Sequence, residues 1–415
     1  MNKKLFRQIR NEWKSNLWLI AELLLISVVM WYILDFIYVK ASIFYQPRGF
    51  DISHCYLLRM GRLDPKSPKY MAKDTTESED IRNILTRIRH RPEVEAASLS
   101  ANSYPYNGSN SSTSIRYDTL QNNNWLIRRL VTPDFLRVFK YEGSRGETPS
   151  QLASMMDNKS IMASNNIFKK KYHIKLTTLV GKKVIWGDDT TTRYKLAAAY
   201  TPVRYDDYSE AYHSYSMLYK LPEGWYTTDN NLELCIRVKP SMDHDFIKKL
   251  WKDCERHINT GNVYITNITS FKDVRKKFQQ YQSNQIRNFV TGIIFLLLNI
   301  FLGLLGTFWF RTQQRRSEIA LQMALGSTRR QIFLRQISEG IIILVLASIP
   351  AIIIDLNIAY AGLTQYMHGA TLQPGRFIIT VSATFLISAI MIIIGDWFPA
   401  RKATKVQPAE ALHED

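Results

Sequence analysis

The stretch FVTGIIFLLLNIFLGLLGTFWF, residues 289–310, is apolar at most positions and carries no charged side chain. Its length fits the roughly 20 residues that an α-helix needs to cross the hydrocarbon core of a bilayer. Three further runs, residues 17–39, 337–356 and 377–398, have similar length and composition. Buried helices of soluble domains are usually shorter and more polar. The sequence therefore predicts four transmembrane helices.

The first run lies where a secretory signal peptide would also be found. Its apolar stretch exceeds the roughly 7 to 15 residues of a signal peptide, and no clear small-residue cleavage site follows it. We expect a retained anchor. In residues 1–16, apolar residues recur at helical spacing among basic ones, which predicts an amphipathic helix on the membrane surface. A disordered basic segment is the alternative.

Basic residues beside the spans predict the topology. They concentrate in residues 1–16, 311–336 and 399–415, whereas the short loop 357–376 has only Arg376. By the positive-inside rule, both termini and the middle loop face the cytosol of a multi-pass membrane protein. The predicted segments are a cytosolic start (1–16), span one (17–39), an extracytosolic domain (40–285), span two (286–310), a cytosolic loop (311–336), span three (337–356), an extracytosolic loop (357–376), span four (377–398) and a cytosolic tail (399–415).

The large domain between spans one and two alternates strand and helix patterns. One β-α-β unit is predicted near its start and a second near its end, which indicates a split α+β fold with an inserted lobe at about 110–225. The units comprise strands at 56–60 and 94–100 around a helix at 77–89, and strands at 232–238 and 263–268 around a helix at 246–258.

Most of the formal charge of +18 lies in this domain. Nucleic acid is the usual first interpretation of such a charge. The basic residues are scattered among acidic ones, however, and no zinc-finger or helix-turn-helix pattern is found, so we predict no nucleic-acid partner. A surface facing anionic lipid, or simple solubility, fits better.

The three cysteines, Cys55, Cys235 and Cys254, all lie in the same domain. Outside the cytosol one pair could form a disulfide, and three reduced, buried thiols are equally compatible with the sequence.

Catalytic motifs are missing from the sequence. It has no Walker A pattern, no HExxH and no G-x-S-x-G, so we predict no enzyme activity, no metal site and no cofactor in this chain. Acidic residues in or beside spans are functional candidates by default. Because those here lie near the predicted span ends, interfacial placement is the favoured interpretation; they are Glu22, Asp35, Glu339, Asp355 and Asp396.

The segment EIALQMALGSTRRQI, residues 318–332, predicts a short, mostly apolar helix. Gly326 is placed to end it in the left-handed conformation, and Thr328 with Gln331 has the spacing of a capping box for the next helix. So apolar a helix is not stable in water. It either lies against lipid or enters a protein groove, and the residue pattern leaves both open.

Two segments resemble a known family. RRSEIALQMALGSTRRQI (315–332) is similar to the loop between spans two and three of FtsX-like, MacB-type ABC transporter permeases, and PARKATKVQPAEAL (399–412) is similar to their C-terminal tail. TPDFLRVF (132–139) and VGKKV (180–184) resemble segments of their periplasmic domain. The order of one span, a large domain and three spans also matches.

The resemblance implies a permease subunit that transmits the motion of an ATPase to a porter-like periplasmic domain, for efflux or export of periplasmic or membrane substrates. It also implies that the membrane is the inner membrane and that the extracytosolic parts are periplasmic. ATP and Mg²⁺ would bind a separate MacB-type ATPase subunit. The other implied partners are a second permease, identical or different, membrane lipid, and, as a further candidate, a periplasmic adaptor. The implied ATPase-coupling residues are Arg315, Arg316, Glu318, Ile319, Leu321, Met323, Ala324, Leu325 and Gly326, and the tail motif comprises Pro399, Ala400, Arg401, Pro408 and Glu410.

One departure from the family pattern lies inside the loop. Gln322 and Met323 stand where the family usually has a basic residue before the alanine, so the contact with the ATPase should differ there. The alternative function is a membrane-anchored sensor or regulator whose periplasmic domain binds a ligand or partner.

Overall fold

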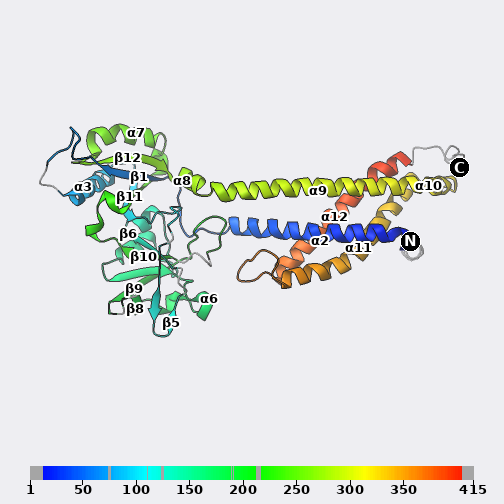
Figure 1. Ribbon diagram of the computed structural model, residues 1–415, viewed down its shortest axis with the longest axis horizontal. Helices are drawn as coiled ribbons and strands as arrows, with labels where there is room; N and C mark the ends of the chain where they lie inside the picture. Colours follow the sequence, from blue (N-terminus) through cyan, green and yellow to red (C-terminus); the bar gives the residue numbers. More distant parts are fainter. Residues whose placement is uncertain are drawn as a thin grey trace. The chain divides into compact units, whose positions relative to one another are not determined.

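The computed structural model describes residues 13–72, 76–109, 111–122, 126–187, 189, 191–211 and 216–403 (Figure 1). The chain forms two compact units. Ile43–Ser283 is called the sheet domain here. Met1–Ser42 together with Asn284–Asp415 is called the helical bundle.

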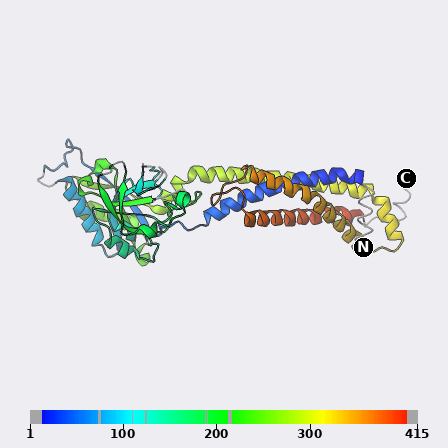
Figure 2. The same ribbon diagram turned by 90° about the horizontal axis from the view of Figure 1, so that it is seen from below.

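Within the described residues, the helical bundle has four helices that are long and apolar enough to cross a membrane: α2 (Trp13–Phe44), α9 (Gln280–Gln314), α11 (Arg329–Tyr360) and α12 (Pro374–Ala403). They lie side by side in both views (Figure 1, Figure 2). The prediction of four spans, with the large domain between the first and second, is confirmed. The helices extend beyond the apolar runs, because polar residues continue each helix; α9, for example, begins at Gln280 rather than at residue 289.

All four helices contribute to one apolar core. Small and branched side chains allow close approach, as at Ala347 of α11, which is fully buried. The core members are Leu19, Leu23 and Ile26 from α2, Leu304 and Phe308 from α9, Ile343, Leu344 and Ala347 from α11, and Ile392 from α12.

The sheet domain contains both predicted β-α-β units, and they interleave. One unit is β1 (Cys55–Arg62), α3 (Glu77–Arg89) and β2 (Val94–Ala101); the other is β11 (Leu232–Val238), α7 (Phe246–Asp253) and β12 (Val263–Ser270). The strands pair in the order β12-β1-β11-β2, and each neighbouring pair is antiparallel. This is the split β-α-β arrangement. Figure 1 labels β12, β1 and β11 next to one another.

The amphipathic pattern of α3 explains its place on this sheet. Ile81, Ile84, Leu85 and Ile88 recur at helical spacing and are buried against the strands. Thr76 begins the helix with a capping box, in which the Glu79 carboxylate accepts from the Thr76 backbone N–H at 2.8 Å.

The insert continues the same sheet. Its strands follow β2 in the order β6-β10-β7-β9-β8-β4-β5, so the described residues form one sheet of 12 strands. Only two residue pairs, Ser100–Val131 and Ala101–Leu130, join β2 to β6. The elements are β3 (Ser112–Thr113), β4 (Ile115–Tyr117), β5 (Leu120–Gln121), β6 (Leu126–Val131), α4 (Phe135–Val138), α5 (Pro149–Ser154), β7 (Ser160–Ser164), α6 (Lys169–Tyr172), β8 (Lys183–Trp186), β9 (Arg193–Tyr200) and β10 (Ser216–Lys220), and the helix α8 (Phe271–Phe278) follows β12.

All three cysteines are free thiols in the sheet domain, and each is buried. Burial raises the pKa of Cys55 and of Cys254 to about 12 and raises that of Cys235 as well. Because the thiolate is the reactive form, these thiols are poor nucleophiles, and their role is packing.

Candidate functional site

A short helix, α10 (Arg316–Ala324), lies between α9 and α11. It ends as the sequence predicts. Gly326 has φ +94°, a backbone conformation that residues with a Cβ rarely adopt. The Gly326 N–H donates to the Met323 carbonyl at 3.0 Å, and the Ser327 N–H donates to the Gln322 carbonyl at 2.9 Å. These bonds occupy carbonyls that the end of α10 would otherwise leave unpaired.

The next helix begins two residues later with the predicted capping box. The Thr328 hydroxyl accepts from the Gln331 N–H at 3.3 Å, and the Gln331 side-chain oxygen accepts from the Thr328 N–H at 2.9 Å. The turn between α10 and α11 is therefore short and fully hydrogen-bonded at the cap, which suits it to hold α10 at a fixed angle.

α10 has two different faces. Ile319 is 5% exposed and packs against Ile332 of α11, with Met323 beside them. On the opposite face, Leu321 is 51% exposed and Leu325 is 80% exposed. The family resemblance implied that Ile319, Leu321, Met323 and Leu325 all contact the ATPase. The structure uses Ile319 to fix α10 to α11 and leaves the leucine face open.

Two more of the predicted coupling residues, Ala324 and Gly326, are exposed like the leucines. Ala320, which was not among the predicted residues, is buried beside Ile319. Glu318 accepts a hydrogen bond from Gln322 at 2.9 Å and lies 3.8 Å from Arg335 of α11. The side chain of Arg316 lies outside what the structure describes.

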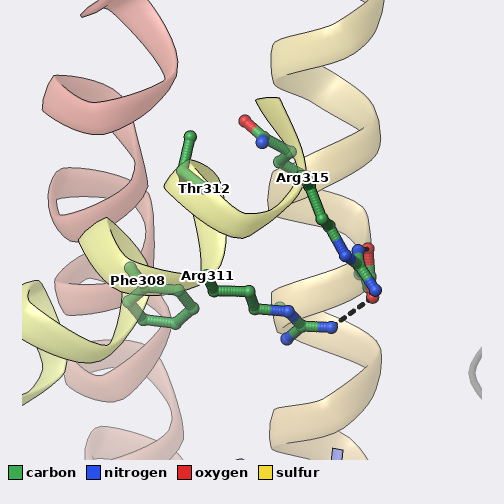
Figure 3. A pocket seen from close by; sticks show the side chains of 7 residues that line it. Phe308, Arg311, Thr312 and Arg315 are labelled. Carbon is green, nitrogen blue, oxygen red and sulfur yellow. Dashed lines mark hydrogen bonds and ion pairs between the residues drawn. The ribbon is translucent and has the colours of Figure 1, made fainter. Parts of the chain in front are cut away.

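The helices that flank α10 are tied by an ion cluster. Arg315, just after α9, donates to both carboxylate oxygens of Glu339 on α11, at 2.8 and 3.0 Å, and Arg311 of α9 pairs with the same carboxylate. Figure 3 shows Arg311 and Arg315 extending from α9 toward the neighbouring helix. We call Arg311, Arg315 and Glu339 the brace.

A cavity of about 20 Å³ lies beside the brace, lined partly by Thr312 and Gln336 (Figure 3). The side-chain oxygen of Gln336 is buried without a hydrogen-bond partner. A polar cavity of this size has room for one water molecule, which would satisfy that oxygen.

Sequence reasoning missed the brace. Glu339 was expected at the membrane interface, and Arg311 counted only toward topology. The structure instead buries Glu339 between α9 and α11. A usable signal was present: Arg311 and Arg315 are four residues apart, so they share one helix face, and the acidic residue lies in the next span.

The opposite end of the bundle contains a second buried ion pair. Asp35 of α2 accepts two hydrogen bonds from the Arg376 guanidinium of α12, one of them from Nε at 2.6 Å. One turn along, the Trp31 indole N–H donates to the Thr380 hydroxyl at 3.0 Å. Asp35 is thus also buried within the bundle, where α12 supplies its counter-ion.

In the sheet domain, one loop contacts both connections to the spans: the residues that follow α2, and the residues of α8 and early α9 that lead into the second span. We call residues 201–211 the clasp loop. Asp207 is buried and accepts from Arg275 of α8 at 2.6 Å, and it lies 3.2 Å from Arg48, which follows α2. The buried Arg204 donates to the Gln46 carbonyl at 2.8 Å.

Two further contacts fix the clasp loop. The Tyr208 hydroxyl lies 2.8 Å from the Ser283 hydroxyl in α9. Gly49 approaches so closely that an added Cβ would lie 2.2 Å from the Pro202 carbonyl oxygen, and its φ is +79°. Both chain junctions therefore contact the same loop of the insert.

The tail motif is only partly placed. Pro399, Ala400 and Arg401 fall in the last turns of α12, but their side chains lie outside what the structure describes, as do Pro408 and Glu410 altogether.

Comparison with known families gives a match over α9 to α12 and beyond. Residues 290–408 match the family described as FtsX-like permease C-terminal. This region is an FtsX-like permease domain. The domain includes α10, the brace and the Asp35 partner Arg376, so these features belong to its membrane-embedded framework and the loop between its spans.

The curated relatives that match this chain are distant. It is 22% identical over 184 residues to the macrolide export ATP-binding/permease protein MacB of Agrobacterium fabrum, and 24% identical over 190 residues to the protein of the same name from Pectobacterium atrosepticum. Each match covers 44% of this chain and 27% of the relative. The chain thus spans about a quarter of the length of the curated relatives it matches.

Proposed function

We propose that this chain is the permease subunit of an ABC transporter of the MacB/FtsX type, coupling ATP hydrolysis by a separate ATPase subunit to conformational change in the sheet domain. The observation that carries the proposal is the two-faced α10. Its buried face, with Ile319, is fixed to α11, and its leucine face, with Leu321 and Leu325, is open. The match to the FtsX-like permease family spans this helix.

The leucine face suits a protein groove. Leu321 and Leu325 lie one helical turn apart, so they project in the same direction. A short helix presenting spaced apolar anchors is a recurring way to enter a hydrophobic groove. The groove would belong to the ATPase, so we infer that this end of the bundle lies in the cytosol, as the charge pattern also predicts for both termini.

The brace would carry the motion of α10 into two spans. Arg315 and Glu339 join the end of α9 to α11, so a push on α10 moves both helices. α9 is continuous over 35 residues, about 52 Å at 1.5 Å per residue. At its other end, Ser283 and the preceding α8 contact the clasp loop, which would pass displacement to the insert.

The relatives fit this division of labour. Their name joins ATP binding and permease in one protein, and this chain matches about a quarter of their length. We propose that ATP and Mg²⁺ bind the partner ATPase, that two permeases assemble with it in the inner membrane, and that the sheet domain faces the periplasm. Export of a periplasmic or membrane-derived substrate is the expected work.

Co-purification tests the proposal. The full chain and the MacB-type ATPase of the same genome would be produced together, with Leu325→Asp as the test variant. Gln313→Asp, an exposed position just before α10, adds the same charge and serves as the matched control. We expect the ATPase to be lost with Leu325→Asp alone. Equal recovery of the ATPase with both variants would contradict the proposal and favour a sensor that works without it.

A further inference from the structure

A cavity of about 420 Å³ lies among α2, α11 and α12 inside the helical bundle. Its lining is mostly apolar, with Phe385 and Leu386 among its members. Five polar side chains also face it: Ser27, Ser348, Asp355, Ser382 and Thr384. Volume and lining are those of a small-molecule site, which is typically apolar with a few polar groups.

Asp355 is the unusual member of this lining. It is 2% exposed, and its Oδ1 is buried without a hydrogen-bond partner. The other two buried carboxylates in the described spans have counter-ions, since Arg376 pairs with Asp35 and Arg315 pairs with Glu339. An unpaired carboxylate in an apolar setting is costly, and buried charges are normally paired. Of these three carboxylates, Asp355 is thus the one that is not paired with a basic side chain of the described residues.

The neighbouring polar groups are hydroxyls, which can both donate and accept. The Ser27 hydroxyl is buried without a partner. The Ser348 hydroxyl donates to the Leu344 carbonyl at 2.7 Å, and the Thr384 hydroxyl donates to the Thr380 carbonyl at 2.8 Å. A hydroxyl that donates to the backbone keeps its lone pairs for accepting. None of the described lining residues is basic, so a cation for Asp355 would have to come from a ligand, whose N–H groups could also donate to these hydroxyl oxygens.

We propose that this cavity binds a hydrophobic molecule bearing one ammonium group, which donates to Asp355 while the apolar body packs on Phe385 and Leu386. Ile352 and Leu386 at the lining are themselves exposed, so the cavity is open to the surface of the bundle. In a span this surface meets lipid or another membrane helix, so a ligand dissolved in the bilayer could enter directly. The ammonium could come from a free amine or from the headgroup of phosphatidylethanolamine.

This inference goes beyond the proposed function and does not depend on it, because ligand binding requires no ATPase. Loss of ATPase recovery with Leu325→Asp and loss of ligand binding with an Asp355 variant are separate results.

Direct binding tests the proposal. Purified full-length chain in maltoside micelles would be titrated into 1-amino-12-(dansylamino)dodecane, followed by dansyl fluorescence anisotropy. The matched neutral probe is the same compound with its amine acetylated. We expect the amine to bind about tenfold more tightly than the acetylated probe, as for a hydrogen bond between charged groups. We also expect Asp355→Asn to abolish the difference. Equal affinity for the two probes, or an unchanged preference in Asp355→Asn, would overturn the proposal.

A second variant guards against a folding defect. Leu386→Trp changes an exposed lining residue and narrows the cavity, so it should weaken both probes while the melting temperature without ligand stays near that of the parent. Unweakened binding in this variant would place the probe elsewhere and overturn the proposal. Competition by phosphatidylethanolamine, but not by its N-acetylated form, would assign the ammonium to lipid. Without such competition, the free amine is the ligand class.

Discussion

Arg315 binds both carboxylate oxygens of Glu339, at 2.8 and 3.0 Å, and so joins the end of α9 to α11 on either side of α10. The carboxylate is buried, and Arg311 completes its pairing. The short helix α10, which carries the exposed leucines, thus connects two spans that are joined by buried ion pairs.

Glu339→Gln should weaken the brace and lower the free energy of unfolding. The substitution removes a buried negative charge that contacts two arginines, and breaking a buried ion pair in this way costs about 3 kcal/mol. The free energy of unfolding would be measured by SDS titration in mixed micelles. Glu318→Gln is the control, because its 3.8 Å pair with Arg335 is exposed and should contribute less than about 1 kcal/mol. A smaller loss for Glu339→Gln than for the control would contradict the account of the brace.

The same variant also tests transmission. In the complex with the ATPase, Glu339→Gln should retain binding, because the leucine face is untouched, yet uncouple ATP hydrolysis from movement of the sheet domain. Fluorescence energy transfer between dyes on α9 and the insert would follow that movement. An unchanged ATP-dependent signal would argue against the brace as the transmitting contact.

The Asp35–Arg376 pair predicts a double-mutant result. Asp35→Asn alone leaves a buried guanidinium uncompensated and should destabilise the bundle by about 3 kcal/mol. Adding Arg376→Met removes the orphaned charge, so the double variant should be more stable than Asp35→Asn. Melting temperatures of the parent, the two single variants and the double variant measure the coupling between Asp35 and Arg376. Simple additivity of the two losses would show that the pair does not act as a unit.

Asp207→Asn should loosen the clasp loop. Burial opposes ionisation of Asp207, but the Tyr106 hydroxyl and the Arg275 guanidinium outweigh it and lower the pKa of Asp207. A lowered pKa in the folded state adds stability above the unfolded pKa, and this stability is lost as the pH falls through the folded value. Hydrogen exchange of residues 201–211 should therefore speed up in the variant at pH 7. Unchanged protection would contradict this prediction, and would show that the contacts of Gly49 and Arg204 are enough to hold the clasp loop.

For Glu233 we predict that stability depends on pH in the opposite direction from Asp207. Its burial in β11 raises its pKa to about 7, although the Ser103, Asn102 and Tyr104 N–H groups donate to it. A carboxyl group with a raised folded pKa adds stability below its unfolded pKa, and this stability falls as the pH rises through about 7. Exchange of the 102–104 amides, corrected for intrinsic rate, should be better protected at pH 5 than at pH 8. Equal protection would contradict this.

Local features were predictable from the sequence, and contacts between distant residues were not. Apolar run length gave the four spans, and the Gly326 stop and Thr328 cap follow from residues within one turn of each other. The side of α10 that Ile319 faces depends on Ile332, and the burial of Glu339 depends on Arg311, so neither could be read from one helix alone.

The insert shows the same limit. Its strands have the alternating apolar and polar pattern expected of a separate lobe. In the described residues, the pairing of Ser100 and Ala101 of β2 with β6 makes them part of the same sheet. Strand partners across more than 25 residues are not encoded in local periodicity. The side of the membrane on which the termini lie stays a prediction from charge.

Site-specific photo-crosslinking tests the central claim, that the leucine face of α10 docks into an ATPase. A benzophenone amino acid would replace Leu325 in the full chain produced with the MacB-type ATPase, and Leu363 in the control. Leu363 is equally apolar and 65% exposed but follows α11, at the other end of the bundle. We predict a crosslinked product with the ATPase from position 325 and none from position 363. Absence of a product from 325, or equal yields from both positions, would contradict the account.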